Sequence, residues 1–205
     1  MYIPKHFRSE DKAEAIAFMR RYSFATLVTA KDNYPEATNL PFTIDERDGN
    51  IILSSHFAKA NPQAQHIADA KPLVVFGEPH AYISPSNYER ELNVPTWNYI
   101  AVHAYGNATI VANIDAQLFS LGQMITSYDQ AYLQQWGGLP MDYKLKMING
   151  IVAFEIKVTD LQAKYKLSQN RSEVERDNII DNLNTSKGTA EQDIARYMTD
   201  LKGHQ

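Results

Sequence analysis

The 205-residue sequence contains no cysteine, which excludes disulfide bonds, thiolate metal ligands and a cysteine nucleophile. Its nine glycines are scattered singly apart from Gly137-Gly138, so neither a dinucleotide fingerprint nor a P-loop can be assembled from them. The six histidines are widely spaced and form no HExxH pattern, which argues against a metal site. A GxSxG nucleophile motif is also missing. These absences exclude the commonest hydrolases, kinases and nicotinamide-dependent enzymes as candidate functions for this sequence.

A basic excess is missing too. The chain has 20 basic and 24 acidic residues, a net charge of −4 and a pI near 5.9. DNA-binding domains usually carry a positive excess, because neutralising phosphates supplies much of their affinity. The best basic stretches, Arg20-Arg21 and Lys144 with Lys146, are short, and no convincing helix-turn-helix stands out. The composition therefore disfavours a dedicated DNA binder, although a local basic patch stays compatible with it.

Long apolar runs are absent as well. None approaches the ~20 residues that cross a bilayer. The opening residues, from Met1 to His6, lack the apolar core of a signal peptide. We therefore expect a cytoplasmic protein without a membrane segment. A hydrophobic fraction of 44% and a charged fraction of 21% are ordinary for a folded domain.

What is present indicates mainly β-structure. Period-two patterns and turn residues predict strands at 24–29, 35–44, 51–54, 73–76, 80–83, 99–111, 151–158 and 163–167. Helices are expected from Ser9, whose hydroxyl would cap the first, to about Tyr22, and then at 61–68, at 115–132, from the break at 137–140 to Gly150, and in the polar tail with an interruption at Lys187-Gly188. No β-α-β-α alternation repeats, so an antiparallel barrel with helical decoration fits better than a doubly wound sheet. The expected division is a barrel domain at 1–171 and a C-terminal helical extension at 172–205.

Four segments carry more polar chemistry than their elements need. In 35–42, Pro41 lies late in an expected strand, which predicts an edge strand or one open to a ligand. In 54–62, hydroxyls and a lysine meet a helix N-terminus, as in a phosphate site or simply a capped helix. The aromatics of 79–99 suit a planar-ligand pocket, a subunit interface or core packing. The basic segment 164–171 suits a solvated loop or a heterocycle or phosphate site.

Taken in this order, the segments resemble the PaiB family of FMN-binding split-barrel proteins. The resemblance covers roughly residues 1–180 and rests on 1–7, 24–29, 37–41, 60–62, 79–85, 94–99, 150–156 and 166–171. The sequence departs from the family pattern at Asn39 and Asn87. The resemblance implies a mainly β fold with α decoration, an FMN-binding split β-barrel that is antiparallel and of Greek-key type, plus C-terminal helices. It also implies a homodimer with FMN at the subunit interface.

The resemblance further implies which residues contact the cofactor. The backbone of Ala37, Thr38, Asn39 and Leu40 would lie along the flavin ring. The phosphate would be bound by Ser54, Ser55, His56, Lys59 and Asn61. A C-terminal motif of Lys166, Ser168, Gln169 and Arg171 would reach the cofactor, including from the partner subunit. No metal ligand and no catalytic residue is assigned.

Family members have been described as negative transcriptional regulators associated with sporulation and secreted-protease synthesis. The expected function is therefore a flavin-binding regulator that uses or senses its cofactor. The alternative is an FMN-dependent oxidoreductase acting on an unknown small molecule, with His80, Tyr82, Trp97 and Asn98 on the substrate side. A third hypothesis is flavin storage or protein interaction without turnover.

Overall fold

The computed structural model describes residues 1–202, and these fall into two compact units. The terminal unit comprises Met1–Ala15, Gly77–Val102 and the chain from Gln162 onward, and the sheet unit comprises Ile16–Phe76 and His103–Leu161. The domain division expected from the sequence, at residue 171, stays a prediction. The last three residues of that expected extension, 203–205, lie outside the described residues.

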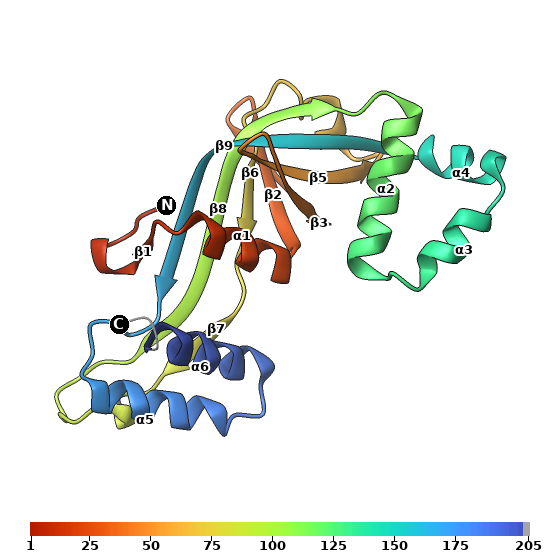
Figure 1. Ribbon diagram of the computed structural model, residues 1–205. Coiled ribbons are helices and arrows are strands. Elements are labelled where there is room, and N and C mark those ends of the chain that lie inside the picture. The colour runs from red at the N-terminus through yellow and green to blue at the C-terminus, as the bar shows by residue number, and fades with distance from the viewer. Residues whose placement is uncertain (203–205) are drawn as a thin grey trace. The chain divides into compact units, whose positions relative to one another are not determined.

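The sheet unit is built on a mostly antiparallel sheet with the strand order β3-β2-β6-β8-β9-β5-β4 (Figure 1). The strands are β2 (Phe24–Lys31), β3 (Tyr34–Pro41), β4 (Thr43–Arg47), β5 (Asn50–Ala58), β6 (Leu73–Phe76), β8 (Thr96–Ile110) and β9 (Ile151–Lys166). The order begins at β3 and ends at β4, so within residues 1–202 the sheet does not close into a full barrel. This open arrangement confirms the predicted split-barrel fold class.

Two tight turns join neighbouring strands, and their residue types are typical of hairpins. β2 and β3 are joined by Asp32 and Asn33, whose φ angles are 52° and 62°. β4 and β5 are joined by Asp48 and Gly49, with φ angles of 50° and 76°. Two-residue hairpin turns of type I′ need positive φ at both positions, which Asn, Asp and Gly tolerate best.

The expected strand at 35–44 is wrong in its extent. The chain bends at Phe42, so β3 ends at Pro41 and β4 begins at Thr43. The two halves pair with different partners, β3 with β2 and β4 with β5. Phe42 is buried between them and faces Phe76 and Phe154. Burial of this ring therefore places the bend.

Two other strands are longer than predicted. β5 continues to Ala58, because its pairing with β9 extends to the partners Ala58 and Ile151. The predicted phosphate residues Ser55 and His56 therefore lie inside a strand and not beyond its end. The expected strands 151–158 and 163–167 are one strand, β9, which keeps a pairing partner near its end in Arg8 and Ser9 of β1 (Arg8–Ser9).

The core of the sheet unit is aromatic. Its innermost side chains are Leu27, Phe42, Leu53, Phe57, Phe76 and Phe154. The backbone of β9 approaches Gly106 closely, since a Cβ there would lie 2.4 Å from the carbonyl oxygen of Lys157. Close packing of β8 on β9 therefore depends on this glycine.

Three α-helices of the sheet unit follow β8 in the chain. They are α2 (Ile114–Tyr128), α3 (Tyr132–Gly138) and α4 (Met141–Ile148). The expected helix 115–132 ends four residues early, because the chain leaves helical geometry at Asp129. The predicted break at 137–140 is confirmed only in part, because α3 includes Gly137 and Gly138 and ends before Leu139.

Two helix starts differ in detail from expectation. α1 (Lys12–Arg21) is capped by Asp11, whose Oδ1 accepts hydrogen bonds from the N–H groups of Ala13 and Glu14 at 2.8 and 3.0 Å. The expected capping hydroxyl of Ser9 instead bonds the Glu14 carboxylate. The expected helix 61–68 shortens to the 3₁₀ helix η2 (Pro62–Gln65), capped by Asn61 as predicted.

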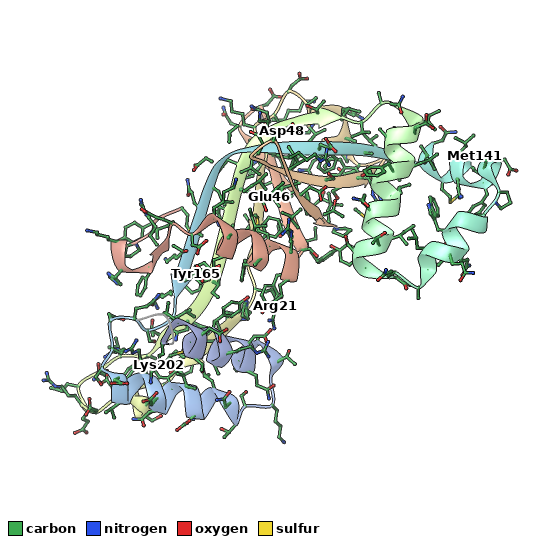
Figure 2. The ribbon with its side chains drawn as sticks, in the orientation of Figure 1. Arg21, Glu46, Asp48, Met141, Tyr165 and Lys202 are labelled. Carbon is green, nitrogen blue, oxygen red and sulfur yellow. The ribbon has the colours of Figure 1, made fainter. Side chains whose placement is uncertain are left out.

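The terminal unit pairs β7 (His80–Ile83) with the start of β8 and is completed by the short helices η1 (Lys5–Phe7) and η3 (Pro85–Asn87). α5 (Glu173–Asn184) packs against α6 (Thr189–Lys202), and α6 packs against β7 (Figure 1). Lys202, labelled in Figure 2, contacts Asp177 of α5. The predicted C-terminal helices and their interruption are thus confirmed. No helix within residues 1–202 is long and apolar enough to span a membrane.

Candidate functional site

A hollow of about 580 Å³ lies along β3 and is called the β3 hollow below. It is lined by residues 34–38 of β3, by Ala58 of β5 and by residues 61–63. Ala37 and Thr38, predicted to lie along a flavin ring, therefore share one hollow with Asn61, predicted to bind its phosphate. Asn39 and Leu40 lie farther along β3, and Asn39 accepts a hydrogen bond from Thr26 of β2 at 2.7 Å.

Only every second residue of β3 uses its backbone N–H and C=O groups to pair with β2. The N–H of Phe42 donates to the carbonyl of Ser23 at 2.9 Å, which fixes the alternation of the antiparallel ladder. Residues 34, 36, 38 and 40 therefore bond to β2, whereas Pro35, Ala37, Asn39 and Pro41 direct their backbone groups away from it. Both prolines occupy positions where the ladder needs no donor. Ala37 and Asn39 present N–H and C=O groups at an edge that no strand pairs within the described chain.

Beneath β3 lies a hydrogen-bonded side chain that sequence reasoning missed. Gln63 is 2% exposed, and its Nε2 donates to the hydroxyl of Thr29 and to the carbonyl of Glu36 at 2.9 and 3.1 Å. Its Oε1 accepts from the hydroxyl of Thr38. The hydroxyl of Thr38 also accepts from Asn61 Nδ2 at 2.9 Å. The capping pair Asn61-Pro62 was the available signal, since it places residue 63 in the first turn.

His66 extends this network and was also missed. Its Nε2 lies 3.1 Å from the Glu36 carboxylate and 3.2 Å from the Thr29 hydroxyl. Both distances join elements that flank the β3 hollow. The network therefore ties η2 and the turn after it to β2 and β3.

The predicted phosphate residues do not all gather at the β3 hollow. Ser54 and Ser55 are neighbours in a strand, so their side chains point to opposite faces of the sheet. Ser55 donates to the carbonyl of Pro41 at 2.7 Å. Lys59 is exposed, two residues from Asn61. Burial lowers the pKa of His56, so its ring is neutral at pH 7 and offers a hydrogen bond more than a charge.

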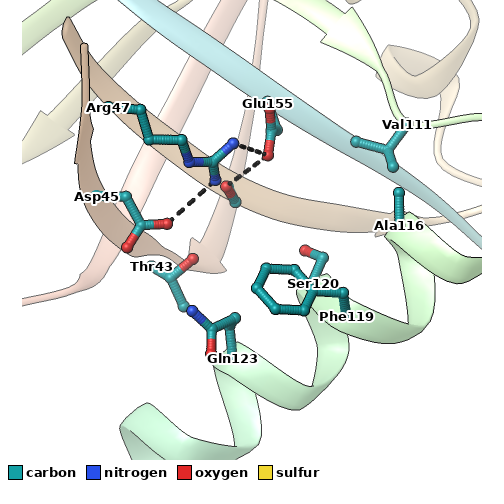
Figure 3. A pocket seen from close by; sticks show the side chains of 10 residues that line it. Thr43, Asp45, Arg47, Val111, Ala116, Phe119, Ser120, Gln123 and Glu155 are labelled. Carbon is teal, nitrogen blue, oxygen red and sulfur yellow. Dashed lines mark hydrogen bonds and ion pairs between the residues drawn. The ribbon is translucent and has the colours of Figure 1, made fainter.

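Ser54 faces a second hollow, of about 260 Å³, between the sheet and α2. Arg47 there donates to Glu155 at 2.8 Å and to Asp45 at 3.2 Å. Figure 3 shows Arg47 pointing toward both carboxylates, with Phe119 of α2 nearby. The guanidinium is thus already engaged by the chain's own acids.

The predicted C-terminal motif lies in the terminal unit, where each of its residues forms hydrogen bonds with other residues of the same unit. Lys166 donates to the hydroxyl of Thr96 and to the carbonyl of Trp97, the latter at 2.6 Å. Burial, and then the nearby Lys164 and Arg171, lower the pKa of Lys166. The motif therefore holds the start of β8.

The other three motif residues also form hydrogen bonds within this unit. Ser168, in the left-handed region at φ 60°, donates to the buried amide of Asn98 at 3.0 Å. Gln169 closes a turn through the N–H of Leu167. Arg171 donates to Asn93 at 2.9 Å, and its guanidinium lies 3.8 Å from the ring centre of Tyr88. A backbone in this region costs free energy, so the turn at Ser168 is fixed by its surroundings.

Three rings proposed for a substrate side cluster on the ribbon of β7 and β8. Trp97 lies 5.9 Å from His80 and 5.8 Å from Tyr82, centre to centre. Tyr82 and Trp97 are 50% and 51% exposed. Asn98, by contrast, is fully buried and bonded to Ser168. Within residues 1–202 no three His, Asp or Glu side chains are close enough to hold a metal ion.

The stability of the protein is expected to depend on pH through Tyr165, which lies near the end of β9 (Figure 2). Burial, and then the carboxylate of Glu14, raise its pKa above the ordinary 10.0. The unfolded chain therefore loses the phenol proton first, so the stabilisation is complete below about pH 10 and falls as the pH rises further. Urea unfolding between about pH 8 and pH 11 should show a steeper loss for the wild type than for Tyr165→Phe. Parallel curves would refute this.

A family model described as "Putative FMN-binding domain" matches residues 1–160. The chain belongs to this FMN-binding family. The "Protease synthase and sporulation protein PAI 2" of Bacillus subtilis (strain 168) is 40% identical over 203 residues, which cover 98% of this chain and 97% of that protein. The predicted resemblance to the PaiB family is therefore confirmed.

Solved structures similar to this PaiB-type chain share its fold. An FAD- and haem-binding protein from Mycobacterium smegmatis has a TM-score of 0.63 at 15% identity, over 78% of this chain and 73% of that one. A flavocytochrome from Azotobacter vinelandii has a TM-score of 0.64 at 11% identity, over 80% and 72%. At these identities the likeness shows a common fold alone.

Proposed function

We propose that this chain binds FMN at the β3 hollow and acts as a PaiB-type flavin-dependent regulator. The observation that carries the binding step is the unpaired edge of β3 beside a hollow whose floor is a fixed hydrogen-bond network. Membership of the FMN-binding family supports the same cofactor.

The residues present fit a flavin. A volume of about 580 Å³ lies within the ~300–1,000 Å³ usual for small-molecule sites. A flat heterocycle needs hydrogen bonds along its edge, and the backbone of Ala37 and Asn39 offers both donors and acceptors. A phosphate needs positive charge, which Lys59 would supply. Bound flavin would contribute redox chemistry, while the protein binds and orients it.

Lys59 gives the direct test. Lys59→Ala should weaken FMN binding about tenfold, because a charge-assisted hydrogen bond to phosphate contributes roughly 1.5 kcal/mol. Flavin fluorescence titration measures the Kd, and Lys146→Ala, a substitution of another exposed lysine, is the matched control. Lys166→Ala tests the C-terminal motif in the same way. The binding proposal fails if the wild type does not bind FMN at micromolar concentration.

The regulatory part of the proposal rests on the name of the Bacillus subtilis relative, which refers to protease synthesis and sporulation. The structure offers little for DNA binding. Lys144 is buried, donates to the carbonyl of Gly137 at 3.2 Å and lies over Trp136. Arg20 donates to the carbonyl of Ile44 at 3.0 Å. A salt-dependent gel shift with upstream DNA and competitor decides whether regulation involves direct DNA contact.

An FMN-dependent oxidoreductase is the second candidate, favoured by the exposed rings of Tyr82 and Trp97 beside His80. Aromatic faces of this kind can hold a planar substrate. The test is reduction of bound flavin by a nicotinamide cofactor, followed by reoxidation with candidate acceptors. If no reductant and no acceptor reacts above the rate of free FMN, this candidate is excluded.

A homodimer is proposed with the same cofactor site. Exposed apolar side chains support it, because exposed apolar patches usually mark the site where another protein binds. In the terminal unit they include Tyr82, Leu92, Val94 and Trp97. Light scattering should give about twice the chain mass of 23.3 kDa. The cytoplasmic location stays a prediction.

A further inference from the structure

The hydrogen bonds of Gln63 have only one consistent arrangement of protons. The Glu36 carbonyl can only accept, so the Gln63 atom 3.1 Å from it must be the NH₂ group. The Gln63 oxygen therefore faces Thr38, and the single hydroxyl proton of Thr38 is donated to that oxygen.

Asn61 fixes the other side of the Thr38 hydroxyl. The backbone N–H of Gln63 donates to Asn61 Oδ1 at 2.9 Å, so the Asn61 NH₂ group is the one that meets Thr38. The Thr38 oxygen thus accepts from Asn61 with one lone pair. Its second lone pair is left, and Thr38 lines the β3 hollow.

We propose that Gln63 is a positioning residue that makes Thr38 a dedicated hydrogen-bond acceptor toward the β3 hollow, so that the site selects a ring edge carrying an imide N–H. This inference rests on the proposed FMN binding and deepens it. A ring carbonyl at the same place would meet only a lone pair, which disfavours ligands with the reverse polarity. The orientation is set by a buried amide that does not itself need to touch the ligand.

The experiment compares FMN with its N3-methyl analogue, which lacks the imide N–H. For the wild type, the Kd of the analogue should exceed that of FMN about five- to tenfold, the worth of one net hydrogen bond of roughly 1 kcal/mol. In Gln63→Leu the Thr38 proton is released, and in Thr38→Val the acceptor is gone. The ratio of the two Kd values should therefore fall toward one in both variants.

The ratio of the two Kd values separates a positioning role from a general loss of stability, because a loss of stability weakens the binding of both ligands alike. Gln65→Leu, an exposed glutamine in the same short helix, should keep the wild-type ratio. Ile156→Val, a mildly destabilising change in the core, should keep it too.

Two failures are distinguishable. If the wild type binds neither flavin, the proposed function is wrong. If it binds FMN but the ratio is near one, or if the ratio persists in Gln63→Leu and Thr38→Val, the inference about Gln63 is overturned while FMN binding stands. A persistent ratio would show that the methyl group is rejected by shape and not by lost hydrogen bonding.

Discussion

Phe154→Ala is expected to lower the free energy of unfolding by about 3–5 kcal/mol. Phe154 is 0% exposed, and its ring packs against Phe57 at 4.8 Å and Phe42 at 6.4 Å between centres. Truncation removes the buried apolar surface and leaves a cavity beside the side chains of β5 and of the bend between β3 and β4. Domains of this size have stabilities of only about 5–15 kcal/mol, so a large fraction of the free energy of unfolding would be lost.

The effect should extend to the cofactor site. Phe154 pairs across the ladder with Ser55, whose hydroxyl bonds the end of β3. We therefore expect FMN affinity to fall with stability in Phe154→Ala. Urea unfolding provides the measurement, and Phe24→Ala is the control, because Phe24 also lies in a strand but is 66% exposed. A loss below about 1 kcal/mol would mean that the aromatic cluster is not the core.

Gly106→Ala is expected to cost about 1–3 kcal/mol or more, the usual penalty of overpacking. The new Cβ would lie 2.4 Å from the Lys157 carbonyl oxygen and 2.6 Å from Cγ2 of Ile156. The first contact involves backbone of β9, which cannot rotate away as a side chain would. β8 and β9 must therefore separate locally, in the middle of the sheet.

Gly122→Ala is the matched control for this change. Gly122 lies inside α2, and a Cβ there meets nothing within 4 Å. Because alanine favours helix over glycine by about 1 kcal/mol, this variant should be as stable as the wild type or more so. Thermal unfolding of the two variants side by side gives the comparison. Equal melting temperatures would contradict the role assigned to Gly106.

Much of the local structure was predictable from the sequence, because it depends on nearest neighbours. Asp32-Asn33 and Asp48-Gly49 predicted hairpins, since few residues tolerate positive φ. β6 and β7 occur at the predicted bounds. The family followed from the order of several short segments, none of which would have sufficed alone.

The location of the cofactor hypothesis came from the resemblance to the PaiB family. Pro41 predicted an edge strand or one open to a ligand, and β3 lies at the end of the strand order. The assignment of individual cofactor contacts stays a prediction.

Tertiary pairing decided what the sequence could not. The bend at Phe42 and the continuity of β5 and β9 depend on which strands lie alongside, and such partners are distant in sequence. Gln63 was overlooked for the same reason, since its partners Thr29, Glu36 and Thr38 come from 25 to 34 positions away. Propensities and turn chemistry act over a few residues and thus determined the elements, whereas the resemblance of several short segments identified the family. The proton arrangement beneath β3 requires three strand and helix segments to meet, so only the folded chain determines it.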